Sequence, residues 1–228
     1  MDHSGDQPTT LREFFGTGER VEFKHGELIG SSEEDKPEVY YILSGYVKIF
    51  SVNPRGEKYV HIIYKSDEIF PLAWTTDQVR RNMFYEALSN VTLLVQSRKV
   101  VANQLKNDPH FSYLMLQRVV DQYRVYTGRI DNLEYKYASE RLAYRLVFLA
   151  ERFGIVKDNT VTIEPVITHQ VLGSSINLSR ESVSREMEKL CRKGLVAYTE
   201  KRQIVLLDCE RLATQYKIPP SLTLATNR

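Results

Sequence analysis

Cysteine is scarce in this sequence, and its scarcity excludes several classes of protein. Cys191 and Cys209 are the two cysteines among 228 residues. Two thiols are too few for a small disulfide-stapled scaffold or for a cysteine-ligated zinc or iron–sulfur centre. We therefore expect no iron–sulfur cluster, and we expect a chain that works in the reducing environment of the cytoplasm.

Long apolar runs and an excess of one charge are also lacking. No window of about 18 residues is apolar and uncharged, and the first ten residues, MDHSGDQPTT, contain no apolar segment typical of signal peptides. The sequence therefore predicts no membrane span and no membrane partner. With 31 Lys and Arg against 29 Asp and Glu, the net charge is +2. Any affinity for nucleic acid must therefore arise from a local patch.

Clusters of catalytic side chains are missing as well. The five histidines are scattered, and the sequence has no His-x-His pair, Ser-His-Asp arrangement or phosphate-binding P-loop. An enzyme of the cupin type, in which a small β-barrel binds a metal, needs clustered ligands. The sequence therefore predicts that the protein is not an enzyme. The alternative is a cupin-type metal enzyme, and stoichiometric iron, manganese or zinc bound in the barrel would support it.

What is present, between about Glu19 and Leu105, is a segment rich in Tyr, Val, Ile and Phe and broken by Gly, Pro and Asp. This composition is typical of β-strands. Two strand-like runs, Val39–Phe50 and Lys58–Tyr64, flank the sequence NPRG at 53–56, so we expect a hairpin with a tight turn. Irregularly spaced glycines between short strands favour a small antiparallel barrel or roll over a parallel α/β sheet.

A helical periodicity begins after Pro109. Side chains recur there at alternating steps of four and three, the spacing of a heptad seam. The heptad seam consists of Leu116, Val120, Tyr123, Thr127, Ile130, Glu134 and Tyr137. It predicts a long helix through which two copies of the chain dimerise, although Gly128 costs about 1 kcal/mol relative to alanine and Glu134 is a poor core residue. The alternative is an amphipathic helix packed on its own barrel.

The C-terminal part has the element order of a winged helix-turn-helix. The segment ASERLAYRLVFLAERFG predicts a helix that is buried on one side and ends at Gly154, and a short strand at Thr160–Ile163 follows. Helices are expected over Thr168–Ile176 and Ser179–Arg192. Two apolar strands on either side of the basic sequence EKRQ at 200–203 predict a hairpin, the wing.

The second of these helices carries candidate contacts to DNA bases. Its apolar positions face inward, so Arg180, Glu181 and Arg185 project from the half that would enter a major groove. A guanidinium donates twice to guanine, and a carboxylate accepts from cytosine N4. Contacts to the DNA backbone, which fix register, are expected from Thr168, His169, Gln170, Ser179, Ser184, Lys201 and Arg202. The alternative is a solvated helix face with an ion pair between Glu181 and Arg185.

The stretch THQVLGSSINLSRESVSREMEKLCRKGLV resembles the helix-turn-helix of the cyclic-AMP receptor protein and fumarate–nitrate reductase regulator (CRP/FNR) family. Its SRESVSR core is similar to the branch that recognises TGTGA-type half-sites, and ERLAYRLVFLAERFG and VYYILSGYVKIF are similarly placed. The resemblance covers nearly the whole chain. It implies a homodimeric transcription regulator that binds palindromic double-stranded DNA, and it assigns base contacts to Arg180, Glu181 and Arg185.

The fold that the resemblance implies is α+β, with an N-terminal cyclic-nucleotide-binding-type β-roll (a double-stranded β-helix), a long dimerisation helix and a C-terminal winged helix-turn-helix. The expected divisions are a polar tail (1–18), a sensor roll (19–107), the dimerisation helix (108–137), the DNA-binding domain (138–212) and a C-terminal tail (213–228). A ligand in the roll would change the packing of the helix pair and so set the spacing of the two recognition helices. An activator would also contact RNA polymerase, and the sequence shows no patch for that contact.

The family's cyclic-nucleotide pocket uses a Gly-Glu-Leu or Gly-Glu-Ile segment, whose Glu binds the ribose, and a downstream Arg-Ser-Ala, whose Arg binds the phosphate. The matching stretch here is SDEIFPLAWTTDQVRRNMFYEAL. The resemblance implies Glu68 and Arg81 as effector ligands, with Asn82 beside them and Thr127 on the long helix as the contact to the base.

Departures from that pattern leave the effector open. Asp67 replaces Gly, Pro71 removes an N–H donor, and Asn82-Met83 replaces Ser-Ala, and a phosphate cradle built on backbone donors tolerates such losses poorly. Cyclic nucleotide, another small molecule and no ligand at all therefore remain alternatives.

Four aromatic residues of this stretch would either line a pocket for an uncharged ligand or, by default, fill the barrel. They are Phe70, Trp74, Phe84 and Tyr85. Haem bound by His25 or His61 is a further alternative, although a lone histidine in a strand-rich domain is more often an ordinary polar residue.

Overall fold

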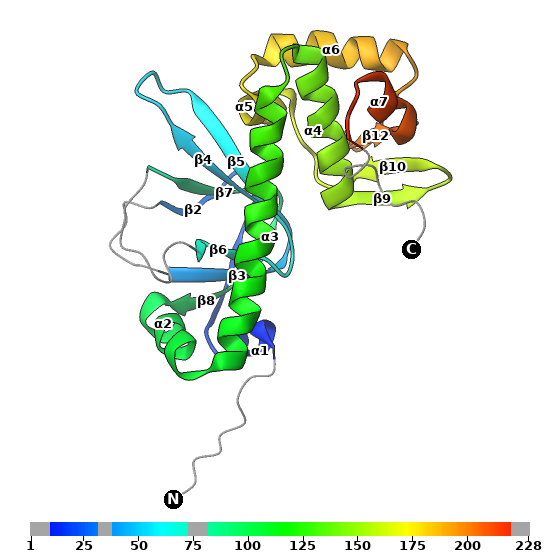
Figure 1. The fold of residues 1–228 in the computed structure, drawn as a ribbon. Coiled ribbons are helices and arrows are strands. Elements are labelled where there is room, and N and C mark those ends of the chain that lie inside the picture. The colour runs from blue at the N-terminus through cyan, green and yellow to red at the C-terminus, as the bar shows by residue number, and fades with distance from the viewer. Residues whose placement is uncertain (1–9, 32–37, 73–81, 220–228) are drawn as a thin grey trace, which may run out of the picture. The chain divides into compact units, whose positions relative to one another are not determined.

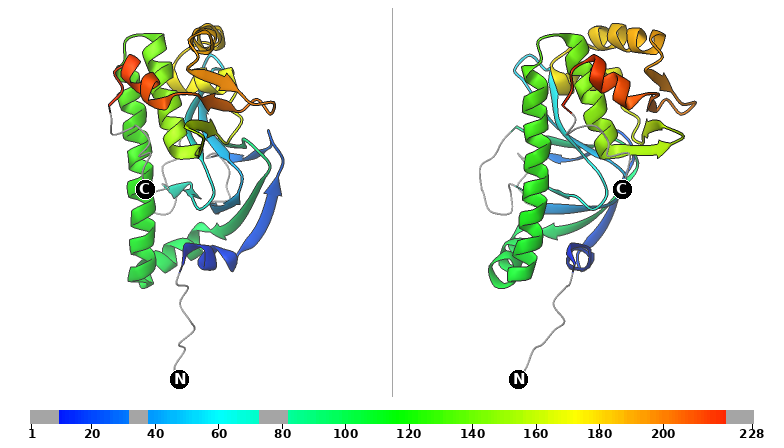
Figure 2. Two further views of the ribbon diagram at one scale, coloured as in Figure 1. Left: turned by 90° about the vertical axis from the view of Figure 1, so that its right-hand side faces the viewer. Right: turned by 45° about the vertical axis from the view of Figure 1, so that its right-hand side comes forward.

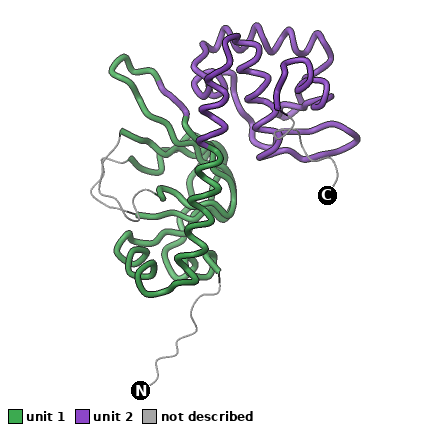
Figure 3. The backbone as a smooth tube through the Cα atoms, in the orientation of Figure 1, with its two compact units in different colours: residues 1–57, 61–125 green, residues 58–60, 126–228 purple. Residues whose placement is uncertain are grey.

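The computed structural model describes residues 10–31, 38–72 and 82–219 (Figure 1). The chain divides into two compact units, residues 1–57 with 61–125 and residues 58–60 with 126–228 (Figure 3). Within the described residues, no helix combines the length and the apolarity needed to cross a bilayer.

The first unit contains a β-roll of two antiparallel sheets, as predicted. Its strands are β1 (Glu19–Phe23), β2 (Leu28–Ser31), β3 (Glu38–Ser44), β4 (Val47–Val52), β5 (Lys58–Tyr64), β6 (Ile69–Phe70), β7 (Phe84–Ala87) and β8 (Val91–Ser97). One sheet has the order β1-β8-β3-β6 and the other the order β2-β7-β4-β5. Both sheets contribute to one core, in which Ile42 and Leu93 of the first sheet lie with Ile49 and Ile62 of the second.

The predicted hairpin is present, but one of its strands is shorter than expected. Strand β3 ends at Ser44, and the next strand, β4, lies in the other sheet. The prediction of one continuous strand over Val39–Phe50 was therefore wrong. The NPRG sequence forms the tight turn between β4 and β5, where the Gly56 N–H donates to the Asn53 carbonyl at 2.9 Å.

Two helices of the first unit were not predicted. Helix α1 (Leu11–Gly16) begins with a capping box between Thr10 and Glu13 and buries Phe14 and Phe15, so a polar tail over 1–18 was wrong for these residues. Helix α2 (Arg98–Asn107) follows β8 directly, within the segment of β composition. Both helices contribute to a second hydrophobic core on the roll.

Helix α3 (Pro109–Glu134) presents two different apolar faces. Phe111 and Met115 are buried in the second core of the first unit, and Val125 packs against the core of the roll. Gln122 on the same side donates to the Tyr64 hydroxyl. The predicted alternative, a helix packed on its own barrel, is therefore correct for this face.

The heptad seam occupies another face of α3 and is exposed. Leu116, Val120, Tyr123 and Ile130 are 57%, 44%, 67% and 60% exposed, respectively. The helix ends at Glu134, and Tyr137 is the N-cap of the next helix. Tyr137, the last residue of the heptad seam, therefore lies outside α3.

Gly128 of α3 lies where a side chain would not fit. A Cβ atom at this position would lie 2.6 Å from the Phe148 ring of α4 (Ala138–Phe153). Nearby, the Asn132 side chain donates to the Arg141 carbonyl at 2.7 Å. The glycine that is costly for an isolated helix therefore permits close packing of α3 on α4.

The second unit is a winged helix-turn-helix, as predicted. After α4 come β9 (Gly154–Lys157), β10 (Thr160–Ile163), α5 (His169–Ile176), α6 (Arg180–Arg192), β11 (Val196–Tyr198), β12 (Ile204–Leu206) and α7 (Cys209–Gln215). The strands form an antiparallel sheet of order β11-β12-β10-β9. Strand β9 and helix α7 were not predicted, and α7 includes the first residues of the expected C-terminal tail.

Helix α4 is the centre of the second unit. It contacts α5, α6, α7, β9 and β10, and Figure 2 shows α7 beside it in both views. Leu142, Leu146 and Leu149, which the sequence placed on one face, are no more than 1% exposed. This core holds the two helices of the helix-turn-helix in place.

Candidate DNA-binding surface

Helix α6 is strongly amphipathic, and its two faces have different roles. Val183, Met187 and Leu190 are no more than 1% exposed and pack into the core of the second unit. Because these residues fix the helix rotation, the opposite face is presented to solvent. The three predicted base contacts, Arg180, Glu181 and Arg185, are all exposed.

The turn between α5 and α6 is tight. Asn177 ends α5 in the left-handed conformation with φ 55°, and the Leu178 N–H donates to the Gly173 carbonyl at 3.0 Å. A Cβ atom on Gly173 would lie 2.5 Å from the Leu178 carbonyl oxygen. Glycine at this position therefore allows the two helices to approach closely enough to form the motif.

Both helices begin one residue after their predicted starts, because Thr168 and Ser179 are their N-caps. The Thr168 hydroxyl accepts from the Val171 N–H at 3.2 Å, and the Ser179 hydroxyl accepts from the Ser182 N–H at 3.1 Å. Thr168 and Ser179 were also predicted to contact the DNA backbone. Both side chains are exposed and lie at helix N-termini, where N–H groups and the helix dipole favour an anion such as phosphate.

Glu181 is an ionised hydrogen-bond acceptor. Its pKa is lowered by hydrogen bonds from its own backbone N–H and from Ser179, and by the nearby Arg180 and Arg185. No ion pair joins Glu181 to Arg185 among the residues that the structure describes, so the alternative of a paired helix face is not formed. The carboxylate keeps acceptor capacity for a partner outside the chain.

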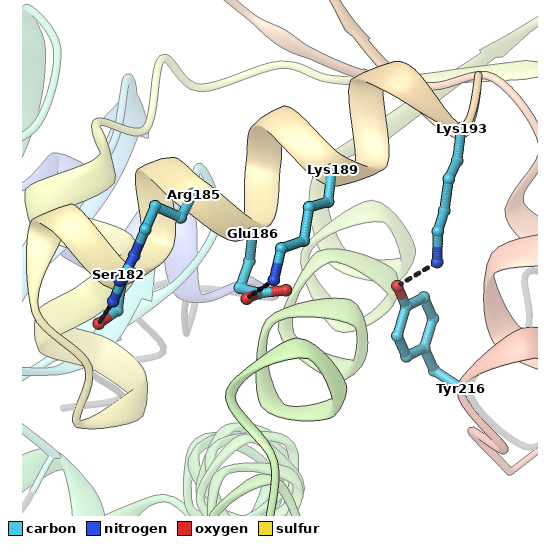
Figure 4. Close-up of polar contacts among 6 residues, drawn as sticks. All are labelled: Ser182, Arg185, Glu186, Lys189, Lys193 and Tyr216. Atoms are coloured by element: carbon cyan, nitrogen blue, oxygen red, sulfur yellow. Dashed lines mark hydrogen bonds and ion pairs between the residues drawn. The ribbon is translucent and has the colours of Figure 1, made fainter.

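The cations on α6 differ in what they contact (Figure 4). Arg185 Nη2 donates to the Ser182 hydroxyl at 3.4 Å. Lys189 pairs with Glu186 at 2.7 Å, and Lys193 lies 3.5 Å from the Tyr216 hydroxyl and 5.6 Å from its ring centroid. Arg180 and Arg185 therefore expose their guanidinium groups on the N-terminal half of the helix, while Lys189 and Lys193 have partners in the chain.

His169 and Ser184 contact each other. The imidazole Nδ1 lies 2.8 Å from the Ser184 hydroxyl, and Nε2 lies 2.8 Å from the hydroxyl of Tyr198 on β11. Burial and the nearby Arg180 lower the pKa of His169. Sequence reasoning placed His169 and Ser184 on the DNA backbone and did not identify Tyr198, since the contact depends on how β11 folds back beside α6.

The wing presents its basic residues at the tip. Lys201 and Arg202 are exposed in the turn between β11 and β12, and Arg202 has φ 62°. The turn is fixed by the Gln203 side chain, which donates to the Glu164 carbonyl at 2.7 Å. Gln170, in the first turn of α5, is exposed as well.

Three of the four predicted effector residues, Glu68, Asn82 and Thr127, lie in the described part of the chain. Glu68 of the first unit is half-buried and accepts from the Lys65 N–H at 3.0 Å, and the exposed Asn82 donates to the Val52 carbonyl at 3.1 Å. Thr127 is half-buried and belongs to the second unit. Arg81 and Trp74 lie outside the described residues.

Asp67, which replaces the family's glycine, adopts the left-handed backbone conformation with φ 66°. Its carboxylate accepts from the Tyr41 hydroxyl at 2.5 Å. Burial, with this carboxylate, raises the pKa of Tyr41. The substitution therefore keeps a backbone conformation that suits glycine, at a position where aspartate also bonds to the roll.

Aromatic side chains fill the core of the roll, which was the default expectation. Phe70 and Tyr85 are at most 3% exposed. The Phe70 ring centroid lies 5.1 Å from that of Tyr40, 5.5 Å from that of Tyr64 and 5.4 Å from that of Tyr85. Phe84 stacks on Phe50 instead, at 5.4 Å.

The histidines considered for haem have other surroundings. His61 Nε2 lies 2.8 Å from the Ser51 hydroxyl, and His25 is exposed. Within the described ranges, no group of three His, Cys, Asp or Glu side chains is arranged to hold a metal ion.

Two family models match the chain. They are the cyclic nucleotide-binding domain, over residues 20–108, and the Crp-like helix-turn-helix domain, over residues 140–215. The global nitrogen regulator of Synechocystis sp. is 26% identical over 166 residues, or 72% of this chain and 74% of that protein. The CRP-like cAMP-activated global transcriptional regulator of Mycobacterium tuberculosis is 22% identical over 209 residues, or 92% and 93% of the two chains.

Solved structures have the same fold. A CooA mutant from Carboxydothermus hydrogenoformans matches with a TM-score of 0.73 at 18% identity and covers 89% of each chain. FixK2 from Bradyrhizobium japonicum matches with a TM-score of 0.71 at 18% identity, covering 92% of this chain and 98% of that one. The order of roll, long helix and helix-turn-helix is therefore shared with known structures.

Proposed function

Because the chain belongs to the CRP/FNR family of transcription regulators, which are not enzymes, we propose that it binds palindromic DNA as a homodimer. Helix α6 enters the major groove of each half-site. The observation that carries this proposal is the exposure of Arg180, Glu181 and Arg185 on the N-terminal half of a helix whose opposite face is buried. This is the part of a recognition helix that contacts base edges.

The chemistry of the three side chains suits half-sites of the TGTGA type. Such a half-site contains two G·C pairs, and each guanine offers O6 and N7 to a guanidinium while the paired cytosine offers N4–H to a carboxylate. Arg180 and Arg185 are the donors, and Glu181 is the ionised acceptor. Phosphate contacts from the helix N-termini and the wing fix the register.

Dimerisation is assigned to the exposed face of α3. Besides the residues of the heptad seam, this helix exposes Tyr113, Val119, Tyr126 and Leu133, each by at least 38%. An apolar stripe of this length is costly in water and is buried when two copies of the helix pack together. The dimer would present two α6 helices to successive turns of DNA.

Control by a small molecule in the β-roll is the second part of the proposal. It is supported by the match of residues 20–108 to the cyclic nucleotide-binding domain. Pro71, Asn82 and Met83 depart from the family's phosphate-binding pattern, so the favoured effector lacks a phosphate. The aromatic core around Phe70 favours a second candidate, a regulator that binds DNA without any effector.

Selection of bound sequences from random DNA tests the proposal. We expect enrichment of a palindrome with TGTGA-like halves whose centres lie one helical turn apart, bound by a dimer as measured by analytical ultracentrifugation. Enrichment of no sequence at low salt would overturn the DNA-binding function. An isolated half-site bound by a monomer would overturn the dimer.

A further inference from the structure

His169 connects three elements of the second unit through one side chain. The residue lies in the first turn of α5, and its ring contacts Ser184 of α6 and Tyr198 of β11, each at 2.8 Å. We refer to these three residues as the imidazole bridge. The Ser184 and Tyr198 hydroxyls occupy both ring nitrogens, so both are satisfied within the chain.

The imidazole bridge lies at the wall of a cleft. A cleft of about 490 Å³ lies beside α6 and β11, and all three bridge residues line it together with Met187 and Cys191. Because side chains do not fill this space, the separation of α6 from the wing depends on polar contacts as well as on packing. Tyr198 is 43% exposed, and the bond to His169 holds its ring over the cleft.

We infer that His169 is a positioning residue, which fixes the wing relative to α6 and makes no contact of its own with the DNA backbone. This inference rests on the proposed DNA-binding function and revises the roles that sequence reasoning gave to His169 and Ser184. Its consequence is that the wing cations, Lys201 and Arg202, reach phosphate while α6 is in the groove only when the bridge is intact.

Charge supports this assignment over a phosphate contact. A histidine that binds phosphate contributes most when it is protonated. Burial and the nearby Arg180 instead lower the pKa of His169 and so disfavour its protonated form, whereas Glu188 acts to raise this pKa. Burial and Cys191 raise the pKa of Tyr198 to about 12, so its hydroxyl keeps the proton. A neutral imidazole between two hydroxyl groups accepts one hydrogen bond and donates the other.

A double-mutant cycle on DNA affinity tests the inference. The variants are His169→Ala, Tyr198→Phe and the double variant, compared on the selected palindrome at several salt concentrations. Because one hydrogen bond contributes a factor of about two to ten, we expect Tyr198→Phe to weaken binding about threefold and His169→Ala about tenfold. The double variant should bind as His169→Ala does, because the bond lost is the same.

Salt dependence separates positioning from phosphate contact. Removing a cation that contacts phosphate lowers the slope of log affinity against log salt by about one. We expect Lys201→Ala to lower this slope. We expect His169→Ala to lower it as well, because the wing cations then lose their phosphate contacts, but to leave it unchanged in a Lys201→Ala, Arg202→Ala background, where a direct phosphate contact by His169 would still lower it. We also expect Lys201→Ala to cost less affinity in the Tyr198→Phe background than in the wild type, since the wing has lost its fixed position.

Thermal unfolding of each variant gives the control for folding, and affinities are compared at a temperature where all variants are folded. Additive losses in the cycle, or a salt slope that His169→Ala lowers just as much in the Lys201→Ala, Arg202→Ala background, would overturn the positioning role. So would unchanged affinity in the folded variants, because the bridge would then stabilise the fold alone. If the wild type itself selects no DNA sequence, the proposed DNA-binding function has failed. That outcome differs from a failure of the positioning role, which requires a wild type that binds.

Discussion

The Arg185 guanidinium lies over the Ser182 hydroxyl, one turn nearer to the N-terminus of α6, with 3.4 Å between Nη2 and the hydroxyl oxygen. The contact is long and uses one donor of the five that the guanidinium has. It directs the side chain toward the N-terminal end of α6, the end that we propose enters the groove. Most donors of the Arg185 guanidinium therefore stay available for the base contact that we propose.

Replacing Arg185 should relax recognition at one base pair. We expect Arg185→Ala to weaken binding to the selected palindrome by about 1–3 kcal/mol, because a bidentate contact to guanine is lost. Arg185→Lys should restore the charge without the rigid, planar pair of donors, and so recover affinity more than specificity. Site selection with each variant checks this, and an unchanged preference at every position would remove Arg185 from base recognition.

Lys201 at the wing tip should act on all sequences alike. Lys201→Ala removes a cation expected to contact phosphate, so we expect affinity for the palindrome and for unrelated DNA to fall by similar factors. The slope of log affinity against log salt should fall by about one. Titrations of both DNAs at several salt concentrations measure these quantities, and a loss confined to the palindrome would contradict the assignment.

The helix-turn-helix was predictable from sequence because its signals are local. Ser179 and Thr168 are caps whose hydroxyls act within three residues, and the spacing of Val183, Met187 and Leu190 fixes the buried face of α6. Caps and helical periodicity are properties of adjacent turns. The C-terminal ends of α5 and α6 accordingly agree with the prediction, and each helix begins one residue after its predicted start, which is the N-cap.

The parts that sequence reasoning missed depend on contacts between distant segments. Helix α1 has six residues, too few for a periodic pattern, and is stabilised by burying Phe14 and Phe15 on the roll. Tyr198 lies 29 residues from His169, so no local pattern joins them. The effector residues stay a prediction, because Glu68 and Thr127 lie on segments that the sequence does not place relative to each other.

A charge in the heptad seam should prevent dimerisation. Val120 of the seam is 44% exposed, and Val100 of α2 is 45% exposed, which makes the two residues a matched pair. We expect Val120→Glu to shift the protein from dimer to monomer in analytical ultracentrifugation and to weaken binding to the palindrome at least tenfold, since burying an unpaired carboxylate costs several kcal/mol.

Val100→Glu is the control for that experiment. It makes the same change of charge and volume on a helix outside the seam, in the first turn of α2, where a carboxylate suits the helix dipole. We expect this variant to remain a dimer. Dissociation of both variants, or of neither, would show that the seam on α3 is not the interface.

Gly128 should be intolerant of a side chain. Because a Cβ atom would lie 2.6 Å from the Phe148 ring, we expect Gly128→Ala to lower the free energy of unfolding by about 1–3 kcal/mol, even though alanine favours helix. Combining it with Phe148→Leu should recover part of the loss by making room. Urea denaturation measures both, and a stabilised Gly128→Ala would show that α3 and α4 do not pack this closely.

The stability of the DNA-binding unit should depend on the protonation of His169. Its pKa is lowered in the folded chain by burial and by Arg180, so between the folded pKa and the ordinary value the unfolded chain binds more protons. The free energy of unfolding therefore falls as the pH falls through that window. His169→Gln keeps a hydrogen-bonding side chain and does not titrate. Between about pH 7.5 and about pH 5.5, we expect wild type to lose more stability than His169→Gln in urea denaturation. Since all other groups are common to both proteins, an equal loss would show that the imidazole is as easily protonated in the folded chain as in the unfolded one.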